Sequence, residues 1–221
     1  MIRTLRGVLA SLCILLIAAC GGGDNVTVQT AQLRVLHASP DAPNVDVYVD
    51  SVKVLSNVPY PTLSSYLSLS PGTHQIKVNV AGTTTTVINV SPTLAVGGAY
   101  TAIAANFVAN IEALLATDAS SAPPNGEVGL RVIHASPDAG PVDILANGQV
   151  VLSNVPFGTI SNYLTVPAGT YAIQVNVAGT TTTAIAATVN LTAGTNYTAA
   201  AIGAIKTAAT NPLALKLLTD D

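Results

Sequence analysis

The chain has 221 residues, of which 49% are hydrophobic and only 9% are charged, and its formal net charge is −3 at pH 7. This balance excludes nucleic acid as a partner, because binding to phosphate backbones needs clustered Lys and Arg. Runs of charged residues at helical spacing do not occur, and abundant Thr, Ser, Asn, Val, Ala and Gly favour thin sheets over helices.

The N-terminus has the features of an export signal. Two arginines precede an apolar run over residues 8–19 that is too short to span a bilayer as a permanent helix. The run ends in Ile17-Ala18-Ala19-Cys20, which resembles the lipobox of bacterial lipoproteins, where a peptidase cuts before the cysteine and the new N-terminus is lipidated. By that resemblance, residues 1–19 are a cleaved signal peptide, Cys20 is lipidated, and residues 20–30 form a flexible tether. An ordinary secretory signal and a short core helix are the alternatives.

Cysteine usage agrees with lipidation. Cys13 lies in the apolar run and leaves with it, so the mature chain keeps only Cys20 and no disulfide is expected. In Gram-negative lipoproteins, an aspartate directly after the lipidated cysteine tends to retain the protein in the inner membrane, and here that position is Gly21. We therefore expect a protein of the bacterial cell envelope that is anchored to the membrane through its lipid, with the outer membrane favoured.

Most of the remaining chain is a tandem duplication. A shift of about 97 residues aligns residues 33–104 with residues 130–201 without a gap, and the phrases VLSNVP, VNVAGTTTT and YTA occur in both halves. ALLATD and LKLLTD re-align near the end of each copy. We expect a first domain at 31–118, a linker rich in Pro and Gly at 119–128, and a second domain at 129–221. The copies could pack together or swing on the linker.

Within each copy, the apolar residues alternate with polar ones, as in residues 45–50 and 76–80, which predicts half-buried strands. Two alanine-rich stretches, residues 99–106 and 198–208, are also predicted as strands because they alternate and lack a helix cap. About seven strands per copy, separated by short turn signals, predict an all-β protein. The expected fold is two tandem antiparallel β-sandwich domains of the immunoglobulin or transthyretin-like kind.

The phrase RVLHASPDA at residues 34–42 returns as RVIHASPDA at residues 131–139. It raises three hypotheses about its polar residues and the aspartates that follow: His37, Ser39, Asp41 and Asp46 in the first copy, and His134, Ser136, Asp138 and Asp143 in the second. Ser-Pro-Asp is typical of a tight turn, whose serine and aspartate oxygens accept backbone N–H bonds. In such a turn, the histidine packs at the strand end and donates to a carbonyl or to Asp46.

The other two hypotheses assign chemistry to the same residues. A His, Ser, Asp triad would make a hydrolase, but these three are close in sequence and no nucleophile elbow accompanies them. Calcium binding could use Asp41, Asp46, Asp50 and the Asn44 carbonyl. The second copy is poorer in ligands, because Asn147 stands at the position of Asp50 and Pro141 at that of Asn44. Zinc is disfavoured by one histidine and no cysteine per copy. A turn and a ligand site explain the repetition equally well.

On these phrases, the chain resembles two tandem copies of the bacterial domain of unknown function numbered 4397, apart from Ala139-Gly140-Pro141 in the second copy. The resemblance carries over no catalytic residue and no cofactor. We expect a non-enzymatic structural or interaction module of the envelope, with a surface protein or a glycan as the partner. The alternatives are a calcium- or glycan-binding surface protein that uses the HASPD loops, and a hydrolase.

Overall fold

The computed structural model describes residues 29–207 and 209–220, so the predicted signal peptide, Cys20 and most of the tether lie outside the described residues. The described chain is made of strands and one 3-10 turn, η1 (Val108–Asn110). Among the residues 29–207 and 209–220, no helix is long and apolar enough to cross a membrane.

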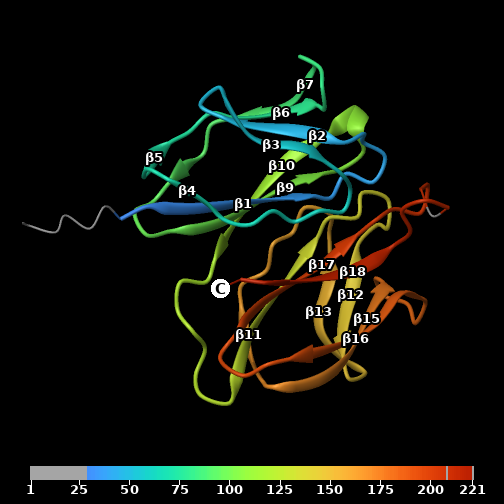
Figure 1. Ribbon diagram of the computed structural model, residues 1–221. Coiled ribbons are helices and arrows are strands. Elements are labelled where there is room, and N and C mark those ends of the chain that lie inside the picture. The colour runs from blue at the N-terminus through green and yellow to red at the C-terminus, as the bar shows by residue number, and fades with distance from the viewer. Residues whose placement is uncertain (1–28, 208, 221) are drawn as a thin grey trace, which may run out of the picture.

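The first domain is a sandwich of two four-stranded sheets, drawn blue to green in Figure 1. One sheet has the order β10-β9-β1-β4, and the other has the order β3-β2-β6-β7. A short β5-β8 pair lies beside them. The strands are β1 (Ala31–His37), β2 (Val45–Val49), β3 (Val52–Val58), β4 (Leu67–Leu69), β5 (Gly72–Thr73), β6 (Ile76–Val80), β7 (Thr86–Val90), β8 (Thr93–Leu94), β9 (Ala99–Ala105) and β10 (Glu112–Asp118).

The second domain repeats this arrangement and is drawn yellow to red in Figure 1. Its sheets have the orders β14-β11-β17-β18 and β13-β12-β15-β16. Here β15 spans the equivalents of β5 and β6, and β16 spans those of β7 and β8. The strands are β11 (Glu127–His134), β12 (Val142–Ala146), β13 (Gln149–Val155), β14 (Leu164–Pro167), β15 (Gly169–Val177), β16 (Thr183–Leu191), β17 (Asn196–Ile202) and β18 (Ala214–Thr219).

The all-β sandwich is confirmed, and both alanine-rich stretches are strands, although β17 ends at Ile202 rather than near residue 208. The expectation of purely antiparallel sheets is wrong at one place in each domain. β1 pairs in parallel with β9, and β11 pairs in parallel with β17. These partners are separated by most of a domain, so no hairpin forces them to run in opposite directions.

The inner strands of the two sheets that meet between the domains are buried on both faces: β1, β9, β11 and β17. In β1, Leu33 and Val35 point into the core of the first domain, whereas Leu36 points to the second domain. The same alternation in β9 places Tyr100 in the core and Ile103 between the domains. Two buried faces explain why β9 and β17 are almost entirely apolar, whereas β1 and β11 each carry a buried arginine and a buried histidine.

The two domains pack together, as Figure 1 shows for β1 and β9 above β17 and β18. A buried apolar cluster joins them and draws equivalent residues from each copy: Leu36, Ala38, Ile103, Ala105 and Ala116 from the first, and Ile133, Ala135, Ala200, Ile202 and Leu218 from the second. Between the two domains, the linker runs from the end of β10 at Asp118 to the start of β11 at Glu127.

Candidate functional site

The two HASPD histidines lie at the ends of β1 and β11 and are fully buried. His37 Nε2 bonds the carbonyl oxygen of Pro43 at 3.2 Å, and His134 Nε2 bonds that of Gly140 at 2.9 Å. Burial lowers the pKa of both rings, and the bond to the backbone carbonyl opposes this only in part. Both rings are therefore neutral at pH 7, with the proton on Nε2, and each fastens its own turn.

The serines of the motif are also buried, at 0% exposure for Ser39 and 1% for Ser136. Within the described part of the chain, neither hydroxyl has a hydrogen-bond partner, so the predicted backbone N–H bonds to the serine oxygens are wrong. The backbone N–H of Ser136 instead donates to His134 Nδ1 at 3.3 Å. A nucleophilic serine needs a base that holds its hydroxyl and a path for substrate. These serines and histidines are neighbours in the sequence, but no hydrogen bond joins a serine hydroxyl to a histidine ring in the described residues.

The motif's aspartates anchor the turn to the loop that follows the central strand. Asp41 accepts a bond from the backbone N–H of Val108 at 2.7 Å. In the second domain, Asp138 accepts bonds from the N–H groups of Ile205 at 2.7 Å and Lys206 at 2.9 Å. The same carboxylate position thus holds the loop after β9 and the loop after β17.

The next aspartate, Asp46, accepts hydrogen bonds from residues of the other repeated phrases. Asp46 accepts bonds from the N–H of Asn57 at 2.8 Å, from that of Gly82 at 3.2 Å and from Lys53 Nζ at 2.7 Å. The Lys53 bond, aided by the two backbone bonds, lowers the Asp46 pKa to about 2. Asn57 has φ +53°, a left-handed conformation that Asn tolerates well and that turns its N–H toward the carboxylate.

Asp143 holds the second copy in the same way, through the N–H groups of Asn154 at 2.8 Å and Gly179 at 2.9 Å. These two backbone bonds lower the Asp143 pKa. The repeated phrases VLSNVP and VNVAGTTTT therefore recur because each supplies an N–H to this aspartate. Sequence reasoning found the phrases but assigned them no common partner.

The predicted calcium ligands do not form a cation site. Asp41 Oδ1 and both Asp46 oxygens face N–H donors, and Asp50 is paired with His74 and with the backbone N–H of Gln75. These donors compete with a cation for the carboxylates. In the described part of the chain, no three His, Cys, Asp or Glu side chains lie close enough together to hold a metal ion.

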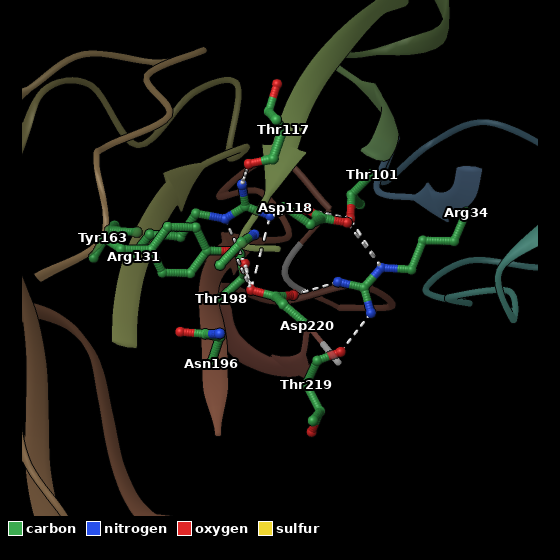
Figure 2. Close-up of polar contacts among 12 residues, drawn as sticks. Arg34, Thr101, Thr117, Asp118, Arg131, Tyr163, Asn196, Thr198, Thr219 and Asp220 are labelled. Atoms are coloured by element: carbon green, nitrogen blue, oxygen red, sulfur yellow. Dashed lines mark hydrogen bonds and ion pairs between the residues drawn. The ribbon is translucent and has the colours of Figure 1, made fainter. Parts of the chain in front are cut away.

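The most unusual polar cluster is one that sequence reasoning missed, and it lies between the domains (Figure 2). Arg34, from β1 of the first domain, is ion-paired with Asp220 of the second domain. It also donates to the carbonyl oxygen of Thr219 at 2.5 Å and to Thr101 Oγ1 at 2.8 Å. Its guanidinium stacks on the Tyr66 ring, 4.6 Å from the centroid.

Arg131 repeats these contacts with the domains exchanged. It is ion-paired with Asp118 and donates to the carbonyl oxygen of Thr117 at 2.8 Å and to Thr198 Oγ1 at 2.6 Å. Its guanidinium stacks on the Tyr163 ring at 4.8 Å. Both arginines and both aspartates are at most 3% exposed. The two ion pairs are therefore reciprocal, and each domain gives one arginine and one aspartate.

Tyrosines complete the cluster. Tyr66 donates to Asp118 at 2.6 Å, and Tyr163 donates to Asp220 at 2.7 Å. Burial and the aspartate acceptor raise the pKa of both phenols, so they remain protonated donors at any physiological pH. One sequence signal could have found this site. The Arg, Asp, Thr and Tyr of the cluster each recur at equivalent positions of the two copies, in a chain where only 9% of residues are charged.

A scan against protein-family models matches the chain twice in tandem to one family, described as domain of unknown function DUF4397, at residues 31–144 and 128–221. The chain belongs to the DUF4397 family. The tandem arrangement predicted from the repeated phrases is confirmed. In this DUF4397 protein, the reciprocal Arg–Asp pairs join the two tandem copies.

A search of the curated proteins found no match for this DUF4397 chain. Among solved structures, it is similar to a family 26 carbohydrate-binding module, CBMbc of Eubacterium rectale Amy13K, crystallised with maltoheptaose. The identity is 11% and the TM-score 0.25, over 85% of this chain and 95% of the module.

Proposed function

We propose that the chain is a lipid-anchored protein of the bacterial cell envelope whose two DUF4397 domains form one rigid, non-enzymatic structural or interaction module. The buried pair of reciprocal Arg–Asp contacts carries this proposal. Four charged groups removed from water need mutual contact, since a buried charge that loses its partner is costly. Such an interface opposes swinging of one domain on the linker.

The use of the motif residues supports a module rather than an enzyme. His37 and His134 bond carbonyl oxygens of their own turns. Asp46 and Asp143 accept bonds from backbone N–H groups. The lipobox-like sequence before Cys20 supports the anchor. A rigid pair of sandwiches on a lipidated tether would present a fixed surface at a distance from the membrane.

The anchor is tested by Cys20→Ser, with Cys13→Ser as the matched control. Cys13 lies in the same N-terminal segment but outside the predicted lipidation position. We expect Cys20→Ser to move the protein out of the membrane fraction and Cys13→Ser to leave it there, with the wild type in the outer-membrane band of a density gradient. A Cys20→Ser protein that stays membrane-bound would refute the lipid anchor.

The non-enzymatic assignment is tested with a panel of ester, peptide and glycoside substrates and a chain that starts at Asp24. All four buried clusters lie between Ala31 and Leu218, so this chain keeps every packing contact described. We expect no turnover above that of a Ser39→Ala, Ser136→Ala double variant. Turnover that this variant loses would make the protein a hydrolase.

A second candidate function, glycan binding, is favoured by a shallow polar groove on the first domain rather than by the HASPD turns. The groove holds about 320 Å³ and is lined by Tyr48, Ser51, Lys77, Asn79, Thr83, Thr84 and Thr86. An aromatic ring beside amide and hydroxyl groups suits sugar rings. In the second copy, Leu145 stands at the position of Tyr48. Titration with envelope oligosaccharides tests this function: binding should be lost in Tyr48→Ala and kept in Leu145→Ala.

A further inference from the structure

An apolar cavity of about 260 Å³ lies between the two sheets of the first domain. Aliphatic side chains from both sheets line it, among them Val35, Val47, Ile88 and Ala113, and no ionisable side chain does. The cavity runs to the edge strands β7 and β10, where Val90 is 37% exposed and Leu115 is 38% exposed. It is larger than the cavity of about 150 Å³ that is known to stay dry and bind benzene.

The second domain has a smaller pocket between its sheets. It holds about 40 Å³ and shares seven lining positions with the first cavity, but it lies toward β13 and β14, and no β16 residue lines it. Register identifies the cause: Ala113 pairs with Ala104 in the first domain, and Leu215 pairs with the equivalent Ala201 in the second. Leu215 therefore occupies the position of Ala113. Ile144 likewise stands where the first domain has Val47.

The two domains differ in how much space they leave between their sheets, and this difference indicates that the cavity of the first domain has a function. Both domains have the same strand order and share repeated phrases, so the fold itself does not require a void. An empty apolar cavity is destabilising, because its lining loses packing contacts. The first domain nevertheless keeps two smaller side chains at adjoining positions, and its cavity reaches solvent between two exposed apolar residues.

We propose that this cavity is a binding site for a small neutral molecule with a short aliphatic chain. The lining offers burial of apolar surface and no charge to pair with an ion, which sets the chemical class. Ser91 also lines the cavity and is exposed, so a hydroxyl or another neutral polar head beside it can remain near solvent. The pocket of about 40 Å³ between the sheets of the second domain is too small for such a molecule.

The experiment titrates 1-octanol into the isotope-labelled chain that starts at Asp24 and follows the backbone amide signals by NMR. We expect saturable shifts at Ala102 and Ala113 of the first domain, and none at Ala199 and Leu215 of the second. Glucose at the same concentrations serves as the polar control and should shift none of the four signals.

A reciprocal exchange of side chains provides the decisive variants. Ala113→Leu copies the second domain into the first and should weaken octanol binding at least ten-fold. Leu215→Ala copies the first domain into the second and should create saturable shifts there. If Ala113→Leu lowers the unfolding midpoint, Val47→Ile is the milder variant and should also weaken binding. Absence of saturable shifts in the wild type, or binding unchanged by both first-domain variants, would overturn the proposal.

Discussion

Removal of one aspartate from the interface should cost far more than an ordinary surface substitution. Asp220 accepts bonds from Arg34 of the other domain, from Tyr163 at 2.7 Å and from Thr198 at 2.5 Å. Asp220→Ala removes this acceptor from the buried Arg34 and Thr198 donors and from the part-buried Tyr163 hydroxyl, and Arg34 carries a full charge. Loss of one member of a buried ion pair typically costs about 3–5 kcal/mol, so we expect a loss of that size in unfolding free energy.

The assay is urea unfolding of the chain from Asp24, followed by circular dichroism, with three comparisons. Asp118→Ala removes the equivalent acceptor and should cost a similar amount. Glu112→Ala removes an exposed carboxylate at the start of β10 and should change stability by no more than about 0.5 kcal/mol. The double variant Arg34→Met, Asp220→Ala removes both charges and should be more stable than Asp220→Ala alone.

The loss should also change the cooperativity of unfolding, because these contacts join the domains. The wild type should unfold in one transition. In Asp220→Ala, the unfolding transitions of the two domains should separate. A cost below about 1 kcal/mol for both aspartate variants, with a single transition kept, would refute the view that the ion pairs lock the domains together.

Three further predictions concern the HASPD turns. His37→Ala and His134→Ala should each lower the unfolding free energy by about 1–3 kcal/mol, measured by urea unfolding, because each ring is buried and bonded to a carbonyl. Burial lowers the pKa of both rings in the folded chain, so below pH 6.5 the unfolded chain binds more protons than the folded one. The unfolding free energy should therefore fall between pH 7 and pH 5. The fall should be smaller in the variant that carries both His37→Ala and His134→Ala. Asp138→Ala should speed amide hydrogen exchange at Ile205 and Lys206, whose N–H groups it holds, and exchange unchanged at both would contradict the role assigned to this carboxylate.

The sequence predicts the duplication, the all-β class and the alanine-rich strands, because these depend on local alternation and on exact repeats. It does not predict the parallel pairing of β1 with β9, since direction is set by how the whole domain closes. The second buried face of β1 is also hidden: an arginine between Leu33 and Val35 is typical of a strand with one face in water.

The candidate site divides in the same way. His37, Ser39, Asp41 and Asp46 are found by their repetition, and the bonds of His37, Asp41 and Asp46 within one domain are those of a turn. The role of Arg34 depends on its ion pair with Asp220, which lies 186 residues further along the chain. No spacing rule links two such positions, so their pairing becomes visible only when the two domains are seen in contact.

The reciprocity of the Arg–Asp contacts gives the interface the form of a twofold-symmetric dimer contained in one polypeptide. Each domain carries both halves of the pairing, so a surface of this kind is self-complementary and two separate copies could satisfy one another. The linker turns that association into an intramolecular event with a fixed effective concentration. Assembly of the pair is thereby independent of the concentration of the protein.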